Sequence, residues 1–188
     1  MKKCLLLAFL LATAQSNALQ IEGVNVAPQA TVNGQVLRLN GAGLRTVVLL
    51  IVPIKAYVAS FYAPSPLRSN SAVLASPGPL QFNFTFLQGV SQSQVAQAWQ
   101  AQFDDSLSYK YSGLANDIAA FTRFFGPIKP MGTQTVEFVG TTTRVIENGQ
   151  LKGTINGRDF QKAFLSLWFG SNPVMPSLKS ALLGSSSG

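Results

Sequence analysis

The chain has 188 residues, of which 47% are hydrophobic and only 11% are charged, and its formal net charge is +7. Its thirteen phenylalanines and its low charge exclude a disordered chain, and its length suits one hydrophobic core. The absence of histidine and the single cysteine, Cys4, exclude imidazole catalysis and metal sites built from His and Cys, so we expect neither a metal nor a cofactor.

The N-terminus has the pattern of a secretory signal peptide. Lys2 and Lys3 precede an apolar run from Cys4 to Ala14, and residues 16–18 place small side chains at both cleavage-determining positions. The run is shorter than the roughly 20 apolar residues that a bilayer-spanning helix needs. We predict cleavage after Ala18, which leaves a periplasmic or secreted chain without cysteine and therefore without disulfides or thiol chemistry.

The first strand pair is predicted by a turn motif. Asn33-Gly34 favours a tight hairpin turn, which would join short strands around residues 30–32 and 35–39.

An apolar stretch from Leu44 to Tyr62 follows, and it resembles a transmembrane segment only in its hydrophobicity. Arg45, Pro53 and Lys55 oppose such a helix, because a central charge costs about 3 kcal/mol and proline removes a backbone hydrogen bond. The many Val, Ile, Tyr and Phe residues favour strands. We predict two adjacent buried strands bent near Pro53, or one long strand with a bulge, and no membrane span in the mature protein.

Residues 80–86 alternate strictly between apolar and polar side chains, which predicts a half-buried strand. Ser91 and Gln94 then show the spacing of a capping box. The sequence therefore predicts a helix from Gln92 to about Leu107, packed on the strand face that carries Phe82 and Phe84.

The remaining elements predict an α+β domain. Helical spacing and turn residues indicate helices over 116–125, 158–169 and 176–184, and strands over 133–139, 141–147 and 150–155. Because strands and helices do not alternate strictly, we expect one antiparallel sheet with helices layered on one side. This domain would span 19–184, with a flexible tail over 185–188.

The positive charge does not indicate nucleic-acid binding. Without Lys2 and Lys3 the chain keeps 12 basic and 7 acidic residues, a net charge of +5. These basic residues are scattered singly from Arg38 to Lys179, whereas nucleic-acid binding proteins carry a basic stripe or cluster. We therefore expect no nucleic-acid partner.

Five segments, in their order and spacing, resemble the chalcone isomerase-like family in its bacterial exported branch. They are residues 39–45 (LNGAGLR), 57–62 (YVASFY), 147–149 (ENG), 156–160 (NGRDF) and 176–184 (PSLKSALLG). The resemblance covers roughly residues 22–184. It implies an open-faced β-sandwich, in which a large antiparallel sheet is covered by a helical layer and a ligand lies between the two. The family includes two kinds of function, since plant members isomerise chalcones and noncatalytic members bind fatty acids. In the noncatalytic members a strand arginine holds the fatty-acid carboxylate, and Arg45 matches that arginine.

Arg45 is the main candidate for ligand binding. It stands among apolar residues, where an unpaired charge is costly, and its planar guanidinium suits a carboxylate. A small apolar carboxylate or a phenolic ligand would satisfy it. The alternatives are a structural ion pair with an acid such as Glu22 or Glu137, or an exposed position at a strand end.

Tyr57 is the second candidate, because the resemblance implies a hydroxyl at about this place on the strand that pairs with the arginine. A tyrosine hydroxyl in an apolar cleft can donate a hydrogen bond to the same ligand oxygen. A core tyrosine bonded to the backbone is the alternative. Four aromatic residues are weaker candidates for lining the pocket, with a plain core role as the alternative. They are Phe82, Phe84, Trp99 and Phe103.

Catalysis is where the sequence departs from the plant enzymes. The positions of their catalytic tyrosine, strand lysine and helix asparagine are filled by Ser91, Phe82 and Ala98. We therefore assign no catalytic residue and expect a noncatalytic binder. An isomerase with its acid and base elsewhere is one alternative, and a protein-interaction module whose cleft is filled by its own side chains is the other.

Overall fold

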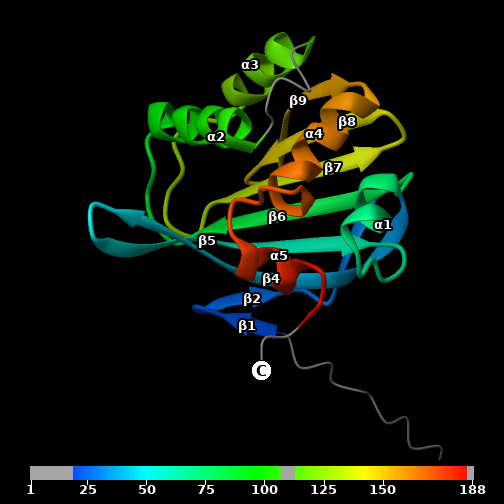
Figure 1. Cartoon of the computed structure of the whole chain (residues 1–188), viewed down its shortest axis with the longest axis horizontal. Coiled ribbons are helices and arrows are strands. Elements are labelled where there is room, and N and C mark those ends of the chain that lie inside the picture. Colours follow the sequence, from blue (N-terminus) through cyan, green and yellow to red (C-terminus); the bar gives the residue numbers. More distant parts are fainter. Residues whose placement is uncertain (1–18, 107–112, 186–188) are drawn as a thin grey trace, which may run out of the picture.

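The computed structural model describes residues 19–106 and 113–185 (Figure 1). The predicted signal peptide (1–18), the predicted helix end at Leu107 and the predicted tail beyond Ser185 lie outside the described residues.

A seven-stranded antiparallel sheet forms the frame of the domain, and each strand pairs with the next one along the chain (Figure 1). The strands are β3 (Gln29–Val32), β4 (Gln35–Leu49), β5 (Val52–Ala63), β6 (Leu80–Phe86), β7 (Thr133–Val139), β8 (Thr142–Glu147) and β9 (Gln150–Asn156). Asn33-Gly34 and Asn148-Gly149 form the tight turns predicted for them, with positive φ at all four residues. The prediction that the strands named in the sequence analysis belong to one antiparallel sheet is confirmed.

Helices cover one face of this sheet, and the core fills the space between the two layers (Figure 1). They are α1 (Asn70–Ala75), α2 (Gln92–Ser106), α3 (Ala115–Arg123), α4 (Arg158–Phe169) and α5 (Pro176–Leu182). The capping box at the start of α2 is present, since Ser91 N donates to Gln94 Oε1 at 3.0 Å and Gln94 N to Ser91 Oγ at 3.4 Å.

The opposite face of the sheet is partly covered by a short hairpin, β1 (Leu19–Ile21) and β2 (Val24–Val26). Val24 and Val26 pack there against Val58, whose neighbours on β5 point into the helix-side core. The sequence analysis predicted neither this hairpin nor α1, because strands of three residues and a helix of six are too short to show a period.

The apolar stretch from Leu44 to Tyr62 forms two adjacent strands, as predicted, but its turn lies at Leu50-Ile51 and not near Pro53. The prediction that both strands are buried is wrong for the tip. Strand β6 pairs with β5 only from Tyr57 onward, so the end of the β4–β5 hairpin extends beyond the sheet and its apolar side chains meet solvent. Figure 1 shows this hairpin (cyan) reaching out past the neighbouring strands.

The glycines of the LNGAGLR segment permit α5 to lie directly on β4. A Cβ atom on Gly41 would collide with the backbone oxygen of Ala181, and one on Gly43 would lie 2.8 Å from the Ala181 side chain. Asn40 fixes the same contact, because its side-chain amide donates to Leu182 O at 2.8 Å. The segment is thus a docking site for the C-terminal helix.

We expect Gly41→Ala to lower the free energy of unfolding by about 1–3 kcal/mol, since α5 has to move away from β4 to admit the methyl group. Gly113→Ala is the matched control, because a Cβ atom there meets nothing within 4 Å. Urea unfolding of the two variants measures the difference. Equal losses for both would show that the close approach of α5 is not the cause.

Candidate functional site

A cavity of about 560 Å³ lies between the sheet and α2, at the end of the sheet where the β4–β5 hairpin projects. This volume falls within the range of roughly 300–1,000 Å³ that is typical of small-molecule sites. Most of the wall is apolar, from Val47, Ile54, Ala56, Phe86, Val95 and Trp99 among others. Its polar members include Arg45 and Tyr57, so the structure brings the two main candidates from the sequence into one cavity.

Arg45 and Tyr57 face each other across two strands because of a β-bulge. They are direct partners in the β4–β5 register, whereas the next pair is Thr46 with Lys55, which leaves Ala56 as the extra residue. The bulge places Ala56 and Tyr57 side by side in the cavity wall.

Arg45 makes no salt bridge with any acid in the part of the chain that the structure describes. Its Nη1 donates to the carbonyl oxygen of Thr46 at 2.9 Å. The two acids proposed as structural partners are paired elsewhere, Glu22 with Lys55 at 2.7 Å and Glu137 with Arg144 at 3.0 Å. The structure therefore contradicts those two ion pairs and leaves the guanidinium on the cavity wall.

The Tyr57 hydroxyl is buried and has no hydrogen-bond partner among the described residues. Burial raises the pKa of Tyr57 to about 12, although the nearby charge of Arg45 opposes the rise. Tyr57 therefore stays neutral at physiological pH and keeps its proton for donation. A buried donor without a partner costs about 1–3 kcal/mol, so a ligand oxygen at this point would be stabilised.

A third donor, Trp168, lies beside this hydroxyl, on a helix that the sequence analysis predicted over residues 158–169 without assigning it a role at the site. The Trp168 indole, from α4, is near the Tyr57 hydroxyl, and its Nε1 is likewise buried without a partner in the described part of the chain. Trp168 is completely buried and does not line the described cavity, so its N–H acts on the Tyr57 oxygen, where it lowers the pKa of Tyr57 against the larger effect of burial. The guanidinium and the phenol are the donors that can meet an anionic ligand oxygen. The inward helical position of Trp168 was the available signal, because a buried indole N–H needs an acceptor.

The raised pKa of Tyr57 predicts a loss of stability in alkali. A folded-state pKa above the unfolded value means that this contribution is complete below about pH 10 and is lost as the pH rises toward about 12. We expect Tyr57→Phe to lose stability less steeply than the wild type over this interval, as measured by urea unfolding at stepped pH. If the free energy of unfolding fell equally with pH in both proteins, the loss would come from a group other than Tyr57.

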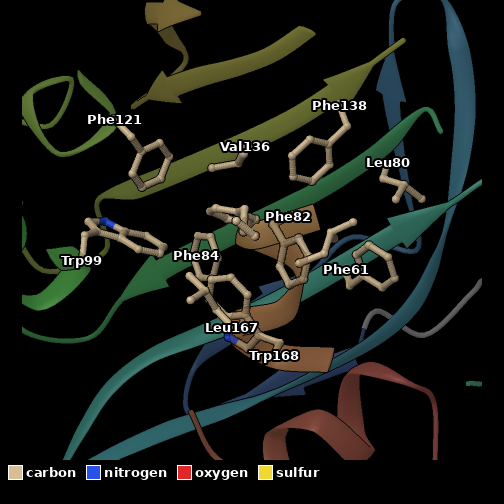
Figure 2. Packing of buried hydrophobic residues seen from close by; sticks show 14 of the residues in the cluster. Phe61, Leu80, Phe82, Phe84, Trp99, Phe121, Val136, Phe138, Leu167 and Trp168 are labelled. Carbon is tan, nitrogen blue, oxygen red and sulfur yellow. The ribbon is translucent and has the colours of Figure 1, made fainter. Parts of the chain in front are cut away.

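Three of the predicted pocket residues lie in the core. Phe82, Phe84 and Phe103 are almost completely buried and do not contribute to the described cavity wall. Figure 2 shows Phe82 and Phe84 packed among other aromatic side chains, with Trp168 and Trp99 close by. The helical layer covers the middle of β6 and leaves its end open, so Phe86 lines the cavity in their place.

Trp99 alone of the four weaker candidates lies in the cavity wall. Its indole N–H donates to Gln134 Oε1 at 3.3 Å, which fixes the ring orientation. On the same helix face, Gln94, Ala98 and Gln102 follow one another at intervals of one turn and also line the cavity. The sequence analysis missed this role because polar and small residues do not stand out as pocket residues.

The resemblance assigns the catalytic positions of the plant enzymes to Ser91, Phe82 and Ala98, and none of these places a titratable side chain in the cavity wall. The Ser91 side chain is exposed and caps α2. Phe82 is buried in the core, and Ala98 presents only a methyl group.

Comparison with known proteins gives the family. A family model described as chalcone isomerase-like matches residues 18–184. No curated protein sequence matches the chain. A crystal structure of a fatty-acid binding protein from Arabidopsis thaliana is similar with a TM-score of 0.68 and 18% identity, over 89% of this chain and 96% of that chain. The similarity confirms the predicted chalcone isomerase-like fold, and the match over nearly the whole sequence shows that this chain belongs to the chalcone isomerase-like family.

Proposed function

We propose that this protein binds a small apolar carboxylate, such as a fatty acid, in the cavity between the sheet and α2 and does not convert it chemically. The observation that carries the proposal is the position of Arg45. Its guanidinium lies in the wall of a largely apolar cavity, without a salt bridge to any acid in residues 19–106 and 113–185. A ligand carboxylate supplies the missing anion.

The arrangement of polar and apolar groups matches an amphiphile. Arg45 and the Tyr57 hydroxyl would hold the carboxylate, while Phe86, Val95 and Trp99 contact the hydrocarbon chain. The structural similarity to a fatty-acid binding protein supports the same class of ligand. An open cavity beside Arg45 argues against the alternative of a cleft filled by its own side chains.

The test is a titration of purified protein with lauric acid and with lauryl alcohol, which has the same chain but no charge. Intrinsic tryptophan fluorescence follows binding, because Trp99, one of the two tryptophans, lies in the cavity wall. We expect the acid to bind more tightly than the alcohol. Equal affinities would remove the role of Arg45, and native mass spectrometry of freshly purified protein would show whether an acid copurifies.

The isomerase alternative is tested on the same material. Incubation with a hydroxychalcone should leave the substrate unchanged, because the positions of the plant catalytic groups are occupied by Ser91, Phe82 and Ala98. Formation of the cyclised flavanone would overturn the noncatalytic part of the proposal.

We further propose that the protein works outside the cytoplasm, as a member of the bacterial exported branch of the family. The support is the charged and apolar pattern of residues 1–18, which is typical of a cleaved signal peptide. Mass measurement of protein from the periplasmic fraction should show a chain that begins at Leu19. An intact N-terminus in that fraction would contradict the proposal.

A further inference from the structure

The end of the β4–β5 hairpin is a continuous apolar projection. Between Arg45 and Lys55 the chain carries no charged residue. The turn residues Leu50 and Ile51 are 93% and 91% exposed, and Val48 is 70% exposed. Large apolar side chains at nearly full exposure mark an interaction surface when they are contiguous.

The turn itself is built against local preference. Leu50 is the first residue of a two-residue turn and has φ +59°, a conformation that favours Gly, Asn or Asp and is strained for a bulky side chain. Because the Leu50 side chain is almost fully exposed, packing within the chain does not offset this strain. A strained, exposed leucine at a tip points to a role outside the folded chain.

The tip is continuous with the mouth of the cavity. Val47 and Ile54, one on each strand just behind the turn, line the cavity wall. The segment around residue 131 lies at the same end of the sheet, because Met131 N donates to Phe86 O and Ile128 pairs with Val90. Met131 is 55% exposed and Lys129 is exposed, so this segment adds an exposed apolar side chain and a cation at the same end of the sheet.

We propose that the β4–β5 hairpin tip, residues 47–53, inserts into the headgroup region of an anionic lipid bilayer and holds the cavity mouth against the membrane. Besides the two turn residues, the tip has three residues on β4 (47–49) and two on β5 (52–53), which reach up to roughly 10 Å, the upper end of the depth of interfacial insertion. Lys129 and the net positive charge of the chain complement anionic headgroups. Docking of the mouth on the bilayer would let a fatty acid dissolved in the membrane enter the cavity without crossing water. This part of the proposal rests on the proposed function.

No helix among the described residues is long and apolar enough to cross a membrane. The proposed contact is of a different kind. The turn of a β-hairpin would lie in the headgroup region, and only the tip side chains would pass from water into the bilayer.

The test is flotation of the purified wild-type protein with vesicles of phosphatidylcholine alone or mixed with phosphatidylglycerol. We expect binding that is stronger to the mixed vesicles and weakens with salt. The Leu50→Asp and Ile51→Asp double variant should lose affinity by about tenfold or more per side chain, because burying each one away from water is worth that factor. Aspartate is tolerated at positive φ, so the variant should fold.

Val36→Asp is the matched control, because Val36 is 54% exposed at the opposite end of β4. It should bind vesicles like the wild type. Equal losses in both variants, or no wild-type binding to either vesicle, would overturn the proposal. So would a concentration-dependent dimer in sedimentation that the double variant abolishes, because a second copy would then cover the tip.

The lauric acid titration, repeated on the double variant in the absence of vesicles, separates this proposal from the proposed function. Retained affinity for the acid with lost flotation supports membrane docking by the tip. Retained affinity for the acid with unchanged flotation overturns docking and leaves the ligand site intact.

Discussion

Arg45→Ala should weaken the binding of lauric acid by about 2–5 kcal/mol, because the carboxylate would enter an apolar cavity without a charged partner. Arg45→Lys should recover only part of the loss, since an ammonium group does not reproduce two parallel hydrogen bonds. Both variants should melt close to the wild type, because Arg45 gives up no salt bridge within the described residues. Isothermal titration calorimetry and thermal melts measure the two effects.

Arg38→Ala is the matched control for this experiment. Arg38 lies on the same strand, is exposed and does not line the cavity, so its removal changes the net charge by the same amount. We expect its affinity for lauric acid to equal that of the wild type. Unchanged affinity in Arg45→Ala, together with a large fall in melting temperature, would instead identify Arg45 as a structural residue.

The elements that the sequence predicted well are those whose signal is local. The Asn-Gly turns, the alternation over residues 80–86 and the capping box at Ser91 each depend on neighbouring residues alone. Arg45 was found because its charge stands out in an apolar strand, and Tyr57 because the family resemblance implies a hydroxyl on the strand that pairs with the arginine. The exact pairing of the two could not be derived from the residues alone, since the strand register depends on a bulge at Ala56 that leaves no mark in the sequence.

The errors concern long-range packing. The apolar tip of the β4–β5 hairpin has the composition of a buried strand, and only the shorter pairing of β6 shows that nothing covers it. Likewise Phe82, Phe84 and Phe86 share one face of a strand, so periodicity cannot tell which of them meets a helix and which meets a cavity. That distinction depends on where α2 and α4 lie, and it can be tested by mutation.

Phe82→Ala should mainly lower the free energy of unfolding, whereas Phe86→Ala should mainly lower the affinity for lauric acid. Phe82 is fully buried, with aromatic neighbours such as Phe61, Phe164 and Trp168 at ring-centroid distances of 4.8, 5.8 and 4.9 Å. Its truncation leaves an unfilled hole and should lower the free energy of unfolding by about 3–5 kcal/mol. The cavity wall keeps its side chains, so affinity for lauric acid in the folded protein should change little.

Phe86 is only partly buried and faces the cavity, where its ring lies 5.6 Å from that of Tyr57. Phe86→Ala should cost less stability than Phe82→Ala, because the new space adjoins a cavity that is already open. It should weaken lauric acid binding by about 1–2 kcal/mol, since the hydrocarbon chain loses apolar contact. Urea unfolding and calorimetry on both variants give the comparison. A loss of affinity in Phe82→Ala without a loss of stability would move Phe82 from the core to the ligand site.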